Sequence, residues 1–224
     1  MSFDHSQLQA EYDACSAQKQ VYLDDLKQIV IDSKESLEGN SFYKHASLNL
    51  YSDLYAKQAN IFWCGKQATT RICEIGFNAG HSTMLMLLGR DATALEFTVF
   101  DIGHHVYTRP CLDYMRSKFP HVAFEYIEGD STVTMPKWIR ENHSLSGAYD
   151  VVHVDGGHSE KCIINDMKNA DVLVKEGGIL IIDDTNYSYI NTVVDQYLRS
   201  GNYKELDVLK TAGYPHRIIQ KCAV

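Results

Sequence analysis

The strongest constraint on the fold is an alternation of short apolar stretches with helix-like stretches that begins near Thr70. Each apolar stretch has the length and the β-branched or aromatic content of a buried strand. The strands are predicted at Arg71–Ile75, Phe97–Asp101, Val122–Ile127, Asp150–Val154 and Ile179–Ile182. The helices between them are predicted at Ser82–Leu88, Thr108–Phe119, Ser131–Arg140 and Ser159–Val174. This alternation predicts an α/β fold with a parallel sheet that is covered on both faces.

The C-terminal part continues with a predicted helix over Tyr189–Arg199. Two further strand-like runs follow, at Lys204–Leu209 and His216–Lys221, and the residues between them contain Gly213 and Pro215. A short connection with glycine and proline favours an antiparallel hairpin.

The first part of the chain, residues 1–66, lacks the strand–helix alternation and is predicted to be a helical extension to a domain over 67–224. Apolar residues recur at helical spacing between Val21 and Val30, and a second helix is predicted over Ser47–Phe62. The extension could be a packing layer or lid. Alternatively, its tyrosines could line a substrate pocket or an interface of a homo-oligomer, with Tyr43, Tyr51 and Tyr55 as the candidates.

A glycine-bearing loop, Gly76 to Gly80, joins the first predicted strand to its helix. Glycine lets a ligand approach the backbone because it has no Cβ, and the start of the following helix offers unpaired N–H groups. The spacing is Gly-x-x-x-Gly, which differs from the Gly-x-Gly-x-x-Gly of dinucleotide enzymes. An ordinary tight turn is the alternative for the loop taken by itself.

Composition excludes several classes of protein. Of the 224 residues, 45% are hydrophobic and 22% charged, which is typical of a globular domain, and the net charge of −8 argues against nucleic acid as a main partner. We also expect no membrane partner, because no apolar run is long enough to span one. Met1–Ser6 lacks signal-peptide features, and the six cysteines form no Cys-x-x-Cys pair, so we expect reduced thiols in the cytoplasm. Cys73 and Cys162 lie in apolar segments and are interpreted as core residues.

Acidic residues stand at or just beyond the carboxyl end of every predicted strand in the parallel part. They are Glu74, Asp101, Asp130, Asp155 and the pair Asp183–Asp184. Ligands of open parallel sheets bind at this edge. Any one of these residues could be a helix cap instead. Asp101 is placed to bind a ribose diol, and Asp130 with Ser131 either caps a helix or contacts an adenine.

Asp155, Asp183 and Asp184 are expected to lie together, because neighbouring strands are only about 4.8 Å apart. Carboxylates this close repel, so either one is protonated or a cation lies between them. Oxygen ligands suit Mg²⁺, Mn²⁺ or Ca²⁺, and a capping cluster without metal is the alternative.

Histidines surround the same edge of the sheet. His158 follows Asp155 by three residues and could be a general base or a cap of the next helix. His153 lies within a strand and is interpreted as a sheet histidine. His104 and His105 follow the second strand, where a solvated loop is favoured over a ligand contact.

Together, these motifs resemble class I S-adenosylmethionine-dependent methyltransferases. The motifs are Glu74-Ile-Gly-Phe-Asn-Ala-Gly-His-Ser, Phe100-Asp-Ile-Gly, Glu128-Gly-Asp-Ser, Asp150-Val-Val-His-Val-Asp-Gly-Gly-His-Ser and Gly177-Gly-Ile-Leu-Ile-Ile-Asp-Asp-Thr. The Asp-Gly-Gly-His segment is similar to that of metal-dependent O-methyltransferases of phenols and antibiotic sugars. The resemblance implies a Rossmann-like, doubly wound sheet of seven strands in the order 3-2-1-4-5-7-6, with strand seven antiparallel.

The resemblance also implies roles for single residues. The cofactor S-adenosylmethionine would be bound by the glycine loop, by the ends of the second and third strands and by Asp155. These residues are Glu74, Gly76, Phe77, Asn78, Gly80, Ser82, Asp101, Ile102, Gly129, Asp130, Ser131 and Asp155. A divalent cation such as Mg²⁺ would be bound by Asp155, Asp183 and Asp184. His158 falls where catechol-type relatives have a lysine base, and with Asp155 it is the predicted catalytic pair.

The resulting hypothesis is a metal-assisted O-methyltransferase that acts on a small molecule with neighbouring hydroxyls, a phenol or a sugar. Three alternatives stay open. They are a metal-independent methyltransferase with His158 as base, a cofactor-binding scaffold without turnover, and a nicotinamide oxidoreductase, which the absent Gly-x-Gly-x-x-Gly disfavours.

Overall fold

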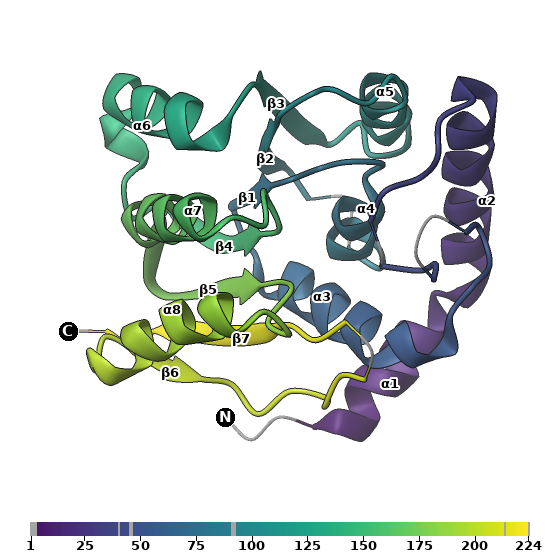
Figure 1. Ribbon diagram of the computed structural model, residues 1–224. Coiled ribbons are helices and arrows are strands. Elements are labelled where there is room, and N and C mark those ends of the chain that lie inside the picture. The colour runs from purple at the N-terminus through teal and green to yellow at the C-terminus, as the bar shows by residue number, and fades with distance from the viewer. Residues whose placement is uncertain (1–3, 40, 45–46, 91–92, 213, 224) are drawn as a thin grey trace.

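The computed structural model describes residues 4–39, 41–44, 47–90, 93–212 and 214–223. Seven strands form one sheet in the order β3-β2-β1-β4-β5-β7-β6 (Figure 1). Their bounds are β1 Arg71–Ile75, β2 Leu95–Asp101, β3 Val122–Glu128, β4 Tyr149–Val154, β5 Val174–Ile182, β6 Tyr203–Glu205 and β7 Arg217–Lys221. The first five strands are parallel, and β7 pairs antiparallel with both β5 and β6. The predicted fold class, strand order and antiparallel seventh strand are confirmed.

Two predicted strand boundaries are wrong. The fifth strand begins at Val174 rather than Ile179, because Gly177 and Gly178 lie inside it. Gly177 has a φ of 72°, and the pairing of β5 with β4 shifts register between Tyr149 and Val151, so the two glycines make an irregularity within the strand rather than a turn before it. The sixth strand ends at Glu205, and the hairpin connection is therefore much longer than predicted.

Helices cover both faces of the sheet in two layers (Figure 1). One apolar core joins the sheet to α1 His5–Ala14, α2 Ser16–Ser33, α3 Tyr55–Gln67, α4 His81–Leu87 and α5 Thr108–Lys118. A second core joins the opposite face to α6 Ser131–Glu141, α7 Glu160–Leu173 and α8 Ser188–Arg199. Both faces of the central strands are therefore buried, as expected for apolar strands that alternate with helices along the chain.

The N-terminal extension shares its core with the sheet. Its third helix starts at Tyr55, later than predicted, because Ser52–Leu54 form a 3₁₀ turn first, and it continues to Gln67. Eight of the thirteen residues of α3 are buried, and the helix packs against α1 and α4. The extension thus carries side chains from α3 into the interior beside the sheet.

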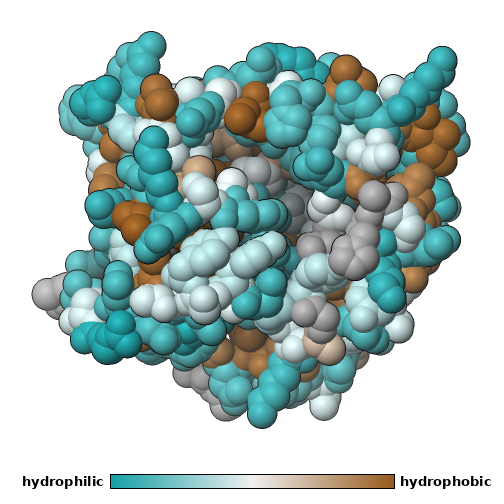
Figure 2. All heavy atoms as spheres, viewed as in Figure 1, coloured by the Kyte–Doolittle hydropathy of each residue, from teal (hydrophilic) through white to brown (hydrophobic). Residues whose placement is uncertain are grey.

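The surface seen in Figure 2 is mainly hydrophilic, with hydrophobic side chains in separate patches. Among the described residues, no helix combines the length and apolar character that crossing a membrane requires.

Candidate functional site

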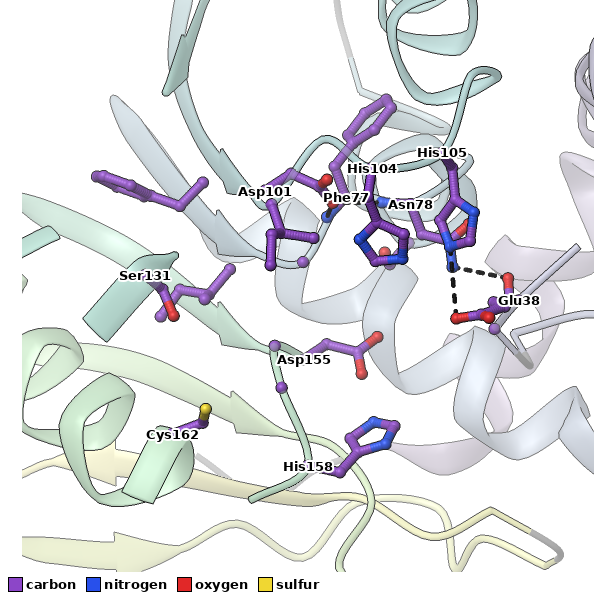
Figure 3. A pocket seen from close by; sticks show the side chains of 18 of the residues that line it. Glu38, Phe77, Asn78, Asp101, His104, His105, Ser131, Asp155, His158 and Cys162 are labelled. Carbon is purple, nitrogen blue, oxygen red and sulfur yellow. Dashed lines mark hydrogen bonds and ion pairs between the residues drawn. The ribbon is translucent and has the colours of Figure 1, made fainter. Parts of the chain in front are cut away.

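A cavity of about 450 Å³ lies at the carboxyl ends of the parallel strands. This volume is within the range of pockets that hold small-molecule ligands. Its wall is made by the loops that follow β1, β2, β3 and β4, together with Glu38, Gly39 and Ser41 of the extension. The predicted binding edge of the sheet is therefore the edge at which the cavity opens (Figure 3).

The loop after β1 is shaped by left-handed residues. Gly76 has a φ of 90°, and a Cβ at this position would lie 1.9 Å from the backbone oxygen of Asp155. Only glycine allows this approach of the β1 and β4 chains. Asn78 also has a positive φ, 53°, and Gly80 (76°) precedes the first turn of α4. Backbone is thereby presented directly to the cavity.

Asp101, at the end of β2, fastens this loop. Its carboxylate accepts hydrogen bonds from the backbone N–H groups of Phe77 (2.8 Å), Asn78 (2.9 Å) and Gly103 (2.7 Å). Asp101 also lines the cavity. A carboxylate has about four lone-pair positions, so these bonds leave capacity for a ligand hydroxyl.

Glu74 does not line the cavity; within the described chain it lies fully buried beneath the loop. Its carboxylate accepts hydrogen bonds from the hydroxyls of Ser82 (2.5 Å) and Thr83, and Nδ1 of His153 lies 3.0 Å away. His153 is thus a sheet histidine, as predicted. The expected direct contact of Glu74 with a cofactor is replaced by a supporting role under the start of α4.

Lys57 is the residue of this site that the sequence analysis missed. It comes from α3, its side chain is fully buried, and its Nζ lies 2.5 Å from Oδ2 of Asp183. The other oxygen of Asp183, Oδ1, accepts the N–H of Asp184 at 2.9 Å. The cation among the acidic residues is therefore supplied by the N-terminal extension.

His158 and Asp184 form a second pair at the cavity wall. Nε2 of His158 lies 2.7 Å from Oδ2 of Asp184, and the His158 ring stacks on Tyr187 at a centroid distance of 5.8 Å. Because a carboxylate only accepts hydrogen bonds, Nε2 carries the proton and Nδ1 is left as an acceptor. Asp155 and His158 both point into the cavity, as Figure 3 shows.

These pairings set opposite pKa directions on neighbouring groups. Burial and the charge of Asp183 raise the pKa of Asp155 well above its ordinary value. Burial acts in the same direction on Asp183, but the Lys57 ammonium together with His153 and His216 outweighs it, and the pKa of Asp183 is lowered. The hydrogen bond from His158 to Asp184 raises the pKa of His158. The electrostatic strain expected among the three carboxylates is thus relieved by Lys57 and by a raised pKa at Asp155.

The predicted metal ligands do not fit a divalent cation as a set of three aspartates. Oδ2 of Asp183 is paired with the buried Lys57 ammonium and Oδ1 accepts a backbone N–H, so a divalent cation on this carboxylate would bind beside a buried positive charge. Asp183 is also not among the described residues that line the cavity. Two other sets of three that contain Asp155 have ligand atoms within 4.8 Å of one another, namely His153, Asp155 and Asp183, and Asp155, His158 and Asp184. The first contains the carboxylate that is paired with Lys57, and only the second lies wholly along the cavity wall of the described residues.

Most other predicted site residues do line the cavity. They are Gly76, Phe77, Asn78, Ser82, Asp101, Ile102, Gly129, Asp130, Ser131, Asp155, His158 and Asp184. Asp130 also caps α6, accepting the N–H of Thr132 at 2.8 Å, so the capping interpretation is confirmed and contact with an adenine stays a prediction.

One further expectation about residues around the cavity, that for Cys162, is wrong. Cys162, in the first turn of α7, lines the cavity rather than packing in the core, and its Sγ lies beside Gly157. His104 and His105 also line the cavity; His105 lies 3.4 Å from carboxylates of both Glu35 and Glu38. These contacts tie their loop to the N-terminal segment, and the loop is also solvated as predicted, since Ile102, His104 and Val106 are exposed.

The tyrosines of the extension do not form the cavity wall in the described part of the chain. Tyr43 packs on the His81 ring at 5.5 Å, and Tyr55 donates a hydrogen bond to Asp13. Instead, the segment 34–39 reaches the cavity, where Asn78 donates a hydrogen bond to the carbonyl of Glu38 at 2.7 Å.

Comparison with known proteins agrees with this geometry. The model of a family described as "Methyltransferase domain", Methyltransf_24, matches residues 73–185, which is half of the chain. No curated protein sequence matches the chain. The protein therefore belongs to this methyltransferase family, and its strand order is that of the class I fold.

Solved structures share the fold at low sequence identity. An O-methyltransferase from Bacillus cereus, solved in complex with SAH, is 16% identical with a TM-score of 0.59, and 91% of each chain is covered. A Corynebacterium glutamicum protein is 13% identical with a TM-score of 0.60, again over 91% of each chain. A Klebsiella pneumoniae protein is 16% identical with a TM-score of 0.57, over 91% of this chain and 90% of that one.

Proposed function

We propose that this methyltransferase transfers the methyl group of S-adenosylmethionine to a hydroxyl of a small molecule. The observation that carries the proposal is the His158–Asp184 pair, 2.7 Å apart, beside the glycine loop that opens onto the same cavity. S-adenosylmethionine supplies an electrophilic methyl on a sulfonium. The residues around it would bind, orient and deprotonate the acceptor.

The cofactor would be held by the residues that already shape the cavity. Gly76 to Asn78 present backbone to the ligand, and Asp101 has lone pairs left for ribose hydroxyls. Asp130 and Ser131, at the start of α6, lie where an adenine would be bracketed. The Asp155 side chain points into the cavity (Figure 3), where binding of a sulfonium cation would favour the ionised form of its carboxyl group.

His158 would remove the acceptor proton at Nδ1 while Asp184 holds Nε2–H. A histidine oriented by a carboxylate is a general base suited to neutral pH. Small neighbouring hydroxyls, as in a phenol or a sugar diol, suit the cavity because Asp155 and His158 offer two polar groups at one wall. Much of the rate would come from positioning donor and acceptor.

A divalent cation remains a second candidate within this function. It is supported by the mutual distances of Asp155, His158 and Asp184. The Asp183 pairing described above opposes it, so no step of the reaction is derived through a metal.

The test is methyl transfer from radiolabelled S-adenosylmethionine to panels of phenols, sugar diols and amines. We expect labelled product with hydroxyl acceptors and a large loss of kcat in His158→Ala, with S-adenosylhomocysteine binding retained. Tight S-adenosylhomocysteine binding without product on any panel would favour the scaffold alternative, and preferential binding of NAD would favour the oxidoreductase.

A further inference from the structure

Lys57 lies where the sequence predicted a metal ion, in contact with one of the three acidic side chains of the cluster. Both members of the Lys57–Asp183 pair are buried, with side-chain exposures of 0% and 2% and an N–O distance of 2.5 Å. The charges of Asp155 and Asp184 also act on the ammonium. Burying an ammonium is unfavourable unless carboxylates compensate its charge. The acidic side chains therefore stabilise the buried Lys57, and Lys57 in turn stabilises the acidic side chains.

The helix that carries Lys57 is held in place by hydrogen bonds of the Gln58 and Asn60 side chains. The Gln58 amide donates to the carbonyl of Ser41 and accepts from the hydroxyl of Tyr12. The Asn60 side chain donates to the carbonyl of Leu209 and also accepts the N–H of Leu209. These bonds join α3 to the N-terminal segment and to the β6–β7 connection, so Lys57 is presented to the cluster by a rigid element.

The pairing of Lys57 with Asp183 leaves Asp155 and Asp184 as the two aspartates of the cluster that line the cavity. Lys57 compensates Asp183 below the wall, while Asp184 pairs with His158 and Asp155 points inward. A divalent ion would have to separate Asp183 from a buried ammonium or bind beside that positive charge. Both are unfavourable, because like charges at such distances repel strongly in a low-dielectric interior.

We infer that Lys57 is a built-in cation that replaces the metal ion, holding Asp183 and making methyl transfer independent of divalent metal. Lys57 is a positioning residue, because it acts through Asp183 and touches neither donor nor acceptor. The inference deepens the proposed function and rests on it for the reaction, but its electrostatic content can be measured without turnover.

The experiment is a titration of Mn²⁺ against the full-length protein, with free Mn²⁺ followed by electron paramagnetic resonance. The wild-type protein is expected to leave the Mn²⁺ signal unchanged at micromolar protein, and its methyl transfer is expected to survive EDTA. Lys57→Met exposes uncompensated carboxylates and is expected to bind Mn²⁺ at least about tenfold more tightly than the wild type. Retained S-adenosylhomocysteine affinity in this variant separates the effect from general disruption.

Lys66→Met is the matched control. Lys66 lies on the same helix and also pairs with a carboxylate, Glu11, at 2.5 Å, but at the surface. The Lys66→Met variant is expected to leave the Mn²⁺ signal unchanged, as the wild type does. The inference would be overturned if the wild type bound Mn²⁺ stoichiometrically, or if methyl transfer were lost in EDTA and recovered on adding Mg²⁺. Neither result depends on the folding of a variant. Absence of product with any acceptor contradicts the proposed function and leaves the Mn²⁺ result to decide the role of Lys57.

Discussion

Replacing Gly76 by alanine tests how the glycine loop forms the cavity. At Gly76, the added Cβ would meet the carbonyl oxygen of Asp155 at 1.9 Å and its carbon at 2.7 Å, and the backbone has a φ of 90°. Backbone atoms cannot swing away as a side chain can, so the β1 and β4 ends must separate. Left-handed strain of about 1–3 kcal/mol and overpacking of about 1–3 kcal/mol together predict a loss of about 4 kcal/mol in the free energy of unfolding.

Gly147→Ala provides the matched control for the strain alone. Gly147 also has a positive φ, 66°, but nothing lies within 4 Å of its Cβ position, and it precedes β4 at the end of the strand away from the cavity. This variant should lose only about 1–2 kcal/mol. The difference between the two variants therefore measures the clash.

The assays are urea denaturation and calorimetric titration with S-adenosylhomocysteine. Gly76→Ala is expected to weaken binding at least about tenfold, which corresponds to about 1.4 kcal/mol, while Gly147→Ala leaves binding unchanged. Equal destabilisation by the two substitutions, or wild-type binding by Gly76→Ala, would refute the reasoning.

Three further predictions concern carboxylates. Asp184→Asn removes the interaction that raises the pKa of His158, so the acidic limb of the kcat/KM profile should move to lower pH; an unmoved limb would contradict His158 as the base. Asp101→Asn places an amide donor against backbone N–H groups, and it should cost about 1–3 kcal/mol in stability and weaken S-adenosylhomocysteine binding. The exposed Asp113→Asn should do neither, as thermal melts and calorimetric titration would show. Lys175 and backbone N–H groups lower the pKa of Asp150 against the effect of burial, so its stabilisation is complete above about pH 4, the unfolded value, and is lost as the pH falls below it. Urea midpoints should then fall less steeply with acid in Asp150→Asn than in the wild type.

Local pattern was enough to predict the sheet and the edge that carries the site. The strands β1, β2 and β4 are buried along nearly their whole length and are separated by helices, so length and composition identify them. Their acidic ends fall together because parallel strands share a carboxyl edge, and Asp101, Asp130, Asp155 and Asp184 accordingly line one cavity. The strand order came from the resemblance, not from periodicity.

Long-range pairing is what the sequence could not reveal. Lys57 and Lys66 lie on the same helix, and nothing in the local sequence tells which of them is buried. Only the packing of α3 beside the sheet brings Lys57 to Asp183, while Lys66 stays at the surface. A signal existed in Lys57-Gln-Ala-Asn60, polar residues within an otherwise apolar helix, which is unusual unless they have buried partners. Glu74 was misjudged for the same reason, since its partners Thr83 and His153 are set by tertiary contacts.

The central claim is that the cavity beside the His158–Asp184 pair methylates a hydroxyl using charges supplied by the chain itself. The most direct measurement is transfer of a labelled methyl group from S-adenosylmethionine to the phenol and sugar-diol panels by wild-type protein in excess EDTA. The account predicts labelled ether product that disappears in His158→Ala. Absence of product from every acceptor, or product that appears only after Mg²⁺ is restored, would contradict it.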